Sequence, residues 1–290
     1  MLFLLLACVV YQGGRTDAFA QVLAAVSIAV LAGHAVVTLG VASAAAFGAI
    51  CCGITFSIEN LGVATGFPFG RYAFRVGEGL AHVGAIPVIV GPLYFGIGYP
   101  AWIIACVLLD SDVAAPRDRP TLVAAPLVAA FTITQWDVVM DPASSTIGKA
   151  WIWFEGGGYF GVPLSNFLGW FLTTWLFFQS FALFAYARRD RLPAKAAGRK
   201  RLTVPILFYV AAALCHLPPM LDPDRVVADG AGRSWSSADI RESAAILALF
   251  TMLPTALLAL IKLWAIRRSA PGDHHDPIRV TAPIARTPSP

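Results

Sequence analysis

Charged residues are scarce in this sequence. Asp, Glu, Lys and Arg make up 13% of its 290 residues, against about 25% in a typical soluble domain. Hydrophobic residues make up 58%, and the mean hydropathy is +0.70. This composition excludes an ordinary soluble protein and indicates an integral membrane protein. Long apolar runs separated by short polar loops are typical of membrane-spanning helices rather than of a barrel. The net charge of +4 comes mostly from one loop and the tail, so it indicates topology and not nucleic-acid binding.

Motifs for metals, nucleotides and disulfides are also lacking. The five cysteines lie in apolar stretches without metal-ligand spacing, so we interpret them as small buried side chains: Cys8, Cys51, Cys52, Cys106 and Cys215. The histidines are too few for the dense ligand set of a membrane di-iron hydroxylase: His34, His82, His216, His274 and His275. There is no P-loop, no GxGxxG opening a nucleotide-binding unit and no GxSxG. We therefore predict no metal site and no cofactor.

Apolar segments are abundant, and they predict an all-α, polytopic transmembrane bundle of about seven spans. We expect these at Ala18–Leu39, Val41–Ile58, Leu80–Leu109, Thr121–Met140, Leu164–Ala187, Leu202–Leu217 and Ser243–Ile266. Leu80–Leu109 contains three prolines and could form a kinked span or a re-entrant hairpin. The opening "MLFLLLACVVY" is too short to span and lacks the basic region of a signal peptide. We expect a single membrane domain over 1–268 and a disordered tail over 269–290.

Basic residues predict the orientation of this multi-pass protein in the cell membrane. The loop 188–201, "RRDRLPAKAAGRKR", is the most basic, and Arg267 and Arg268 begin the tail. Both the loop and the C-terminus should therefore be cytoplasmic. Counting spans backward places three other loops together on the opposite face: Glu59–Gly79, Asp141–Pro163 and Pro218–Arg241. A site built from these loops would lie just inside the bilayer on that side.

Two acids end the fourth predicted span, in "TQWDVVMDP". Asp137 and Asp141 are four residues apart, so on a helix they share one face. Pro142 follows Asp141 and is expected to end the helix. Acids inside a membrane are paired or functional, because an isolated ionised carboxylate there is costly. The structural alternative is that Asp137 pairs with an arginine such as Arg71, while Asp141 caps the loop.

Further polar residues stand in the same group of loops. Glu59 ends the second span, and Arg71 and Tyr72 follow it. Glu59 and Arg71 could form a structural pair, or the pair could hold a proton donor. Glu155 lies in a glycine-rich turn, where the backbone can approach closely. Asn166 begins the next helix, as its cap or as a ligand-binding residue.

Aromatic residues concentrate around these acids: Trp136, Trp151, Trp153, Phe154, Tyr159, Phe160, Phe167, Trp170 and Trp175. A belt at the membrane surface is the usual meaning of Trp and Tyr near span ends. Here, however, the aromatic residues interleave with acids, and electron-rich ring faces stabilise cations. Acids with an aromatic lining are what carbocation chemistry on an alkene requires.

Two stretches carry a resemblance to a known family. "ENLGVATGFPFGRYAF" and "WDVVMDPASSTIGKAWIWFEGGGYFGVPLSNFLGW" resemble the CruF-type carotenoid hydratases, over about Ile54 to Gln179. The resemblance implies cofactor-independent addition of water across the terminal C1=C2 double bond of an acyclic carotenoid. The product is a tertiary 1-hydroxy carotenoid. The resemblance also implies a carotenoid substrate, water and the lipid bilayer as partners. Other enzymes of carotenoid synthesis are candidate partners.

The chemistry of hydration suggests roles for these residues. A neutral carboxylic acid protonates C2, the cation forms at C1, and water attacks there. We expect Asp137 as the acid, Asp141 or Glu59 as the base that orients water, and Arg71 as a residue that adjusts one of them. The expected substrate-binding residues are Tyr72, Trp136, Trp151, Trp153, Glu155, Tyr159, Asn166 and Trp170.

Two other functions fit some of the same features. "DVVMD" is a DxxxD motif, as in intramembrane prenyltransferases that bind Mg²⁺–diphosphate, with Asp222 and Asp224 as the second acid motif. Few basic residues stand nearby to bind a diphosphate, which weighs against this function. The aromatic residues could also form the groove of a carotenoid-binding protein without enzymatic activity.

Overall fold

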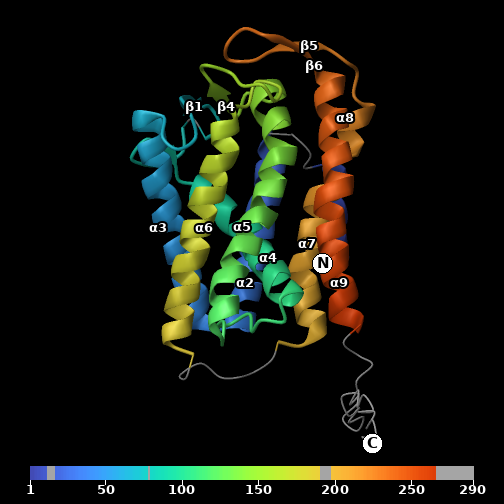
Figure 1. Ribbon diagram of the computed structural model, residues 1–290. Helices are drawn as coiled ribbons and strands as arrows, with labels where there is room; N and C mark the ends of the chain where they lie inside the picture. Colours follow the sequence, from blue (N-terminus) through green and yellow to red (C-terminus); the bar gives the residue numbers. More distant parts are fainter. Residues whose placement is uncertain (12–16, 78, 190–196, 266–290) are drawn as a thin grey trace, which may run out of the picture.

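The computed structural model describes residues 1–11, 17–77, 79–189 and 197–265. These residues are mostly helical, and seven helical segments are long and apolar enough to cross a membrane. This confirms the predicted fold class and indicates a multi-pass membrane protein (Figure 1). The predicted disordered tail, 269–290, and the middle of the basic loop, 190–196, lie outside the described residues.

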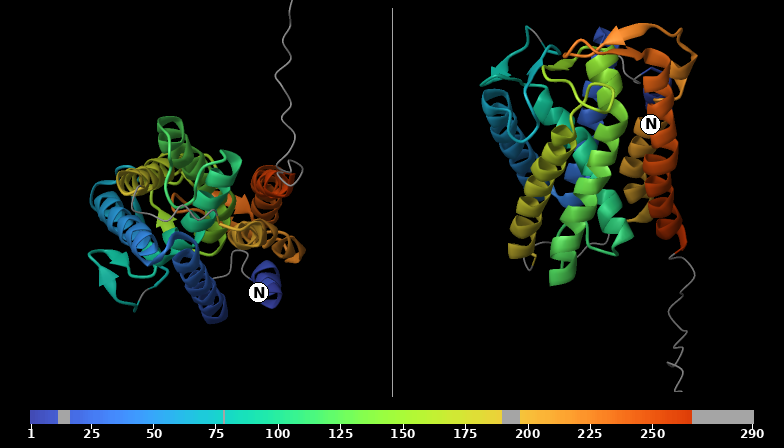
Figure 2. Two further views of the ribbon diagram at one scale, coloured as in Figure 1. Left: turned by 90° about the horizontal axis from the view of Figure 1, so that it is seen from below. Right: turned by 45° about the horizontal axis from the view of Figure 1, so that its top comes forward.

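The first two spans meet at a glycine. α1 covers Leu2–Tyr11, α2 covers Ala18–Leu39 and α3 covers Val41–Thr65. Asp17 caps α2 by accepting hydrogen bonds from the backbone N–H groups of Phe19 and Ala20. Gly40, at φ +84°, ends α2 and precedes α3. Only glycine adopts this conformation readily, so the chain can reverse with almost no loop. α1 lies at the edge of the bundle against α2 and α7 (Figure 2).

The segment Leu80–Leu109 contains one span, as the first alternative predicted, but the span begins later than expected and there is no re-entrant hairpin of helices in this described segment. It begins as a short antiparallel hairpin of β2, His82–Val83, and β3, Ile86–Pro87. α4, Val90–Leu108, then runs through the centre of the bundle with most of its side chains buried. The β-hairpin uses Pro87 at a strand end, where proline is tolerated. Of the three prolines that suggested a broken span, Pro87 lies before the helix, whereas Pro92 and Pro100 lie within α4.

Proline does not end the fourth span at Asp141, contrary to the prediction. α5, Arg119–Asp141, continues into a π-helical turn, η1, Pro142–Ile147. Pro142 has no N–H to donate to the Val138 carbonyl, four residues earlier, and the Tyr159 hydroxyl donates to that carbonyl instead, at 3.2 Å. Turns of π-helix are frequent at functional sites.

The remaining helices complete the bundle. α6 covers Leu164–Ala187 and α7 covers Arg199–Leu214, followed by a 3₁₀ turn, η2, Pro218–Leu221. α8, Ser237–Leu247, η3, Ala248–Met252, and α9, Leu253–Ala265, form one continuous last span. The spans predicted at Ala18–Leu39 and Leu164–Ala187 have the observed bounds.

Two more two-stranded antiparallel sheets lie at one end of the bundle (Figure 1). β1, Tyr72–Phe74, pairs antiparallel with β4, Trp151–Trp153, with Tyr72 opposite Trp153. β5, Val226–Ala228, pairs with β6, Ser234–Ser236. The three loops predicted to share one face therefore do lie together. The end of α6, with Arg188 and Arg189 after it, and the start of α7, at 199–201, lie at the opposite end of the bundle (Figure 1).

Candidate active site

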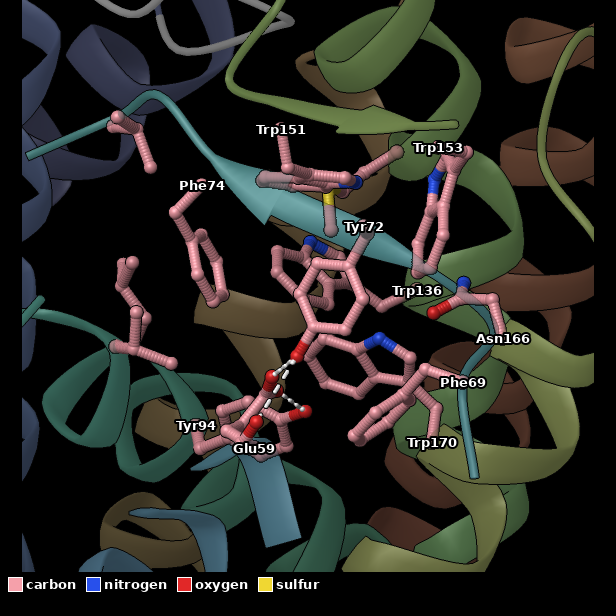
Figure 3. A pocket seen from close by; sticks show the side chains of 14 residues that line it. Glu59, Phe69, Tyr72, Phe74, Tyr94, Trp136, Trp151, Trp153, Asn166 and Trp170 are labelled. Carbon is pink, nitrogen blue, oxygen red and sulfur yellow. Dashed lines mark hydrogen bonds between the residues drawn. The ribbon is translucent and has the colours of Figure 1, made fainter. Parts of the chain in front are cut away.

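An aromatic cavity lies beneath the paired strands β1 and β4, between α3, α4, α5 and α6 (Figure 3). Its volume is about 70 Å³. Its aromatic lining consists of Phe69, Tyr72, Phe74, Tyr94, Trp136, Trp151, Trp153 and Trp170. Five of these, Tyr72, Trp136, Trp151, Trp153 and Trp170, are among the residues predicted from the sequence.

Glu59 is the acid that faces this cavity (Figure 3). Its side chain is buried near the end of α3, which continues to Thr65 and so beyond the predicted end at Ile58. The Tyr94 hydroxyl donates to Oε1 at 2.6 Å, and the Tyr72 hydroxyl donates to Oε2. Burial, together with the neighbouring Glu59, raises the pKa of Tyr72 well above its usual value, so the phenol stays a donor. Tyr94 is itself held by stacking on Trp170, with ring centroids 4.2 Å apart.

Asp137 and Asp141 form a second polar cluster, next to the cavity and fully buried. The Asn166 amide donates to Asp137 Oδ2 at 2.9 Å and to Asp141 Oδ2 at 2.7 Å. The Trp151 indole donates to Asp141 Oδ1 at 2.7 Å. Asp137 Oδ1 has no hydrogen-bond partner among the described residues. A buried carboxylate oxygen without a donor is costly, and either a proton or a bound water would remove this cost.

Asn166 connects the aspartates and does not cap its helix. The N-cap of α6 is Pro163, which makes no side-chain capping bond. Asn166 lies in the first turn of α6, and its side chain lines the cavity next to Trp153 (Figure 3). The capping interpretation was therefore wrong. Asn166 lies 29 residues from Asp137 and 25 residues from Asp141 along the chain. Residue spacing could therefore not predict these two hydrogen bonds.

Arg71 and Glu155, both predicted as site residues, do not line the cavity. Their side chains are 72% and 71% exposed, with Arg71 Nη1 3.9 Å from Glu155 Oε1. Side chains alternate along a strand, so Tyr72 on β1 points inward and the preceding Arg71 points out. Glu59 binds two tyrosine hydroxyls instead of the arginine that we expected.

Tyr159, another predicted binding residue, is not among the residues that line the cavity. Its hydroxyl bonds to the Val138 carbonyl, and its ring packs on Phe167. Burial, with Asp141 nearby, raises the pKa of Tyr159 to about 12. Tyr159 therefore supports the helix that carries both aspartates and does not line the cavity.

Three aromatic residues of the lining were missed from the sequence: Phe69, Phe74 and Tyr94. Phe69 fits between α3 and α6 because both helices have a glycine there. A Cβ atom at Gly62 or Gly169 would lie 2.7 or 2.5 Å from the Phe69 ring. The lone tyrosines of α4 were a usable signal for Tyr94, since a hydroxyl in an apolar helix needs a partner.

The β5–β6 hairpin holds the loop that carries Trp151 and Trp153. Arg233 Nη2 donates to the Gly157 carbonyl at 2.6 Å, and Lys149 Nζ donates to the Ala228 carbonyl. Asp229 accepts from Arg233 Nε at 3.0 Å and so orients that arginine. Asp222 and Asp224, the second acid motif of the prenyltransferase alternative, are engaged nearby: Asp224 binds the start of α8, and Asp222 lies 3.7 Å from Arg241.

Comparison with known proteins identifies the family. Residues 19–218 match the model of the family described as carotenoid biosynthesis protein. A bisanhydrobacterioruberin hydratase from Haloarcula japonica is 31% identical over 119 residues, which are 41% of this chain and 38% of the relative. The alignment thus spans well under half of that relative's length. No solved structure matches the chain. Because the family match covers more than half of the sequence, the chain belongs to the carotenoid biosynthesis protein family.

Proposed function

We propose that this chain is a carotenoid hydratase, which adds water across the terminal C1=C2 double bond of an acyclic carotenoid to give a tertiary alcohol. The observation that carries the proposal is the aromatic cavity faced by Glu59, with the Asp137–Asn166–Asp141 cluster beside it. The family match and the hydratase relative support the same chemistry. An apolar cavity suits a hydrocarbon end, and the acids suit proton transfer.

Asp137 is the proposed acid. Two carboxylates that share one amide group repel each other when both are ionised. Asp141 has a second donor in Trp151, whereas Asp137 Oδ1 has none in the described part of the chain. A shared proton is therefore best placed on Asp137 Oδ1. Trp136 and Asn166, which line the cavity, flank Asp137, so the substrate end would be protonated at C2 between them.

The aromatic lining would stabilise the cation that forms at C1. Ring faces of Trp and Tyr attract positive charge, most strongly where water is excluded. Trp136 and Trp170 lie against each other with centroids 5.8 Å apart, and Trp170 stacks on Tyr94. This stack leads directly to Glu59. The cation would therefore lie between the acid cluster and the Glu59 carboxylate.

Glu59 is the proposed base. Its two tyrosine donors favour the carboxylate form, which accepts hydrogen bonds only. Water held by Glu59 would attack C1 through oxygen and give one proton to the carboxylate. The C2–H and C1–O bonds then form in sequence, and the net change is the addition of one water. Solvent exchange at the polar end would restore the starting protonation of both acids.

Expression in a lycopene-accumulating host tests the proposal. We expect pigment that has gained the mass of one water, with label from heavy-oxygen water in the new hydroxyl. Unchanged pigment that co-purifies with the protein would instead indicate a carotenoid-binding protein. Mg²⁺-dependent consumption of a prenyl diphosphate would indicate a prenyltransferase. An empty-vector host provides the background.

We further propose that the end with Arg188, Arg189 and residues 199–201 faces the cytoplasm, because basic residues favour that side. Cysteines introduced at the two ends test this orientation. Val226→Cys, on the exposed β5 strand, should react with a membrane-impermeant maleimide in intact cells. Gly198→Cys, at the opposite end, should react only after permeabilisation. The reverse labelling pattern would refute the orientation.

A further inference from the structure

A second cavity adjoins the first one inside the bundle. It lies between α1, α2, α4 and α7 and has a volume of about 100 Å³. Leu93 and Trp136 line both cavities. Along α4, the residues that line one or the other run from Val90 to Pro100, which is about 15 Å of helix at 1.5 Å per residue. The two cavities therefore lie one after the other along the axis of α4.

The lining of the second cavity is suited to a hydrocarbon. Its walls include Ala24, Ile28, Gly96, Phe208 and Ala212. Apart from the Trp136 indole, two lining residues carry polar side-chain atoms, and these lie against each other.

These two residues are Cys8 and Ser27. The Ser27 hydroxyl donates to the Leu23 carbonyl at 2.8 Å and lies 3.4 Å from the Cys8 sulfur. Neither group is left to bind a polar ligand. Small residues on facing helices leave the space between them open, and α1, at the edge of the bundle, covers it from the lipid side.

We propose that the second cavity binds the polyene body of the carotenoid while the reacting end lies in the first cavity. Leu93 and Trp136 would form the passage between the two. This inference rests on the proposed function. It is supported by the shared wall, by the apolar lining and by the length of a carotenoid, whose straight conjugated chain cannot fold into the first cavity alone.

Filling the second cavity tests the inference. In Ala24→Phe, a phenyl ring would project from α2 into the space, and lycopene recovered per purified protein should fall about tenfold. Ala212→Phe fills the same space from α7 and should have the same effect. Val26→Phe is the matched control, because Val26 lies on the exposed side of α2, and it should bind as the parent does. Monodisperse elution from a sizing column identifies the folded variants.

A measurement on the parent protein needs no substitution. Squalane, a saturated branched hydrocarbon without a reactive end, should displace bound lycopene, whereas isooctane, which is too short to occupy both cavities, should not. Folded Ala24→Phe or Ala212→Phe with the parent's pigment ratio, or no displacement by squalane, would overturn the inference. These binding results are separate from turnover. A parent that binds lycopene but forms no hydrated product refutes the proposed function and leaves the second cavity as a pigment site.

Discussion

Asp137→Asn should lower formation of the hydrated carotenoid by about a thousandfold, within the range that a general acid contributes. Asparagine has nearly the same shape and can still accept a hydrogen bond from Asn166. It cannot release a proton at Oδ1, the atom that has no partner in the described structure. Liquid chromatography with mass spectrometry, on membranes supplied with lycopene, measures the product directly.

The control for this substitution is Asp239→Asn. Asp239 is exposed in the first turn of α8, away from the cavity lining, so product formation should stay at the parent's level. Bound lycopene should be unchanged in Asp137→Asn, because the cavity lining is intact. Normal product from folded Asp137→Asn would assign the proton to another group and remove Asp137 from the mechanism.

Glu59→Gln should reduce product about a hundredfold, because water then has no carboxylate to take its proton. The substitution also disturbs the two tyrosines. Tyr72 and Tyr94 both donate to the carboxylate, whereas the glutamine amide presents one oxygen and one donor group. One tyrosine hydroxyl would then lose its acceptor. Single-turnover measurements with heavy-oxygen water separate slow water attack from slow protonation.

Tyr94→Phe separates the effect of the Glu59 charge on product formation from the effect of the Glu59 position. It removes one donor and keeps the carboxylate, so product should fall far less than in Glu59→Gln. The matched control is Glu242→Gln, because Glu242 is exposed on α8, and it should have no effect. Equal losses in Tyr94→Phe and Glu59→Gln would indicate that the hydrogen-bonded arrangement, and not proton acceptance, determines the rate.

Hydropathy was sufficient to predict the helical spans, because each must be apolar over a length set by the bilayer. The bounds at Ala18–Leu39 and Leu164–Ala187 followed from sharp changes in composition at Asp17, Gly40 and Pro163. The continuation beyond Pro142 could not be predicted. The Val138 carbonyl, which Pro142 cannot serve, accepts instead from the Tyr159 hydroxyl, and this residue lies 21 positions further along the chain.

The site was predictable in its residue types but not in its pairings. The acids and tryptophans stand out against an apolar background, and spacing places Asp137 and Asp141 on one helix face. Which groups bind them depends on the packing of α5 against α6 and of α3 against α4. Opposite charge suggested Arg71 as the partner of an acid, yet the alternation of β1 turns Arg71 outward and presents Tyr72.

The β5–β6 hairpin matters for any exchange of segments between two proteins of this family. It lies beyond residue 218, where the family match ends, yet it binds the Gly157 carbonyl through Arg233 and receives a bond from Lys149. A chimaera that exchanges only the matched residues would combine the loop that carries Trp151 and Trp153 with a β5–β6 hairpin from a different protein. The junction for such an exchange belongs after Ser237, so that this loop and the β5–β6 hairpin come from the same protein.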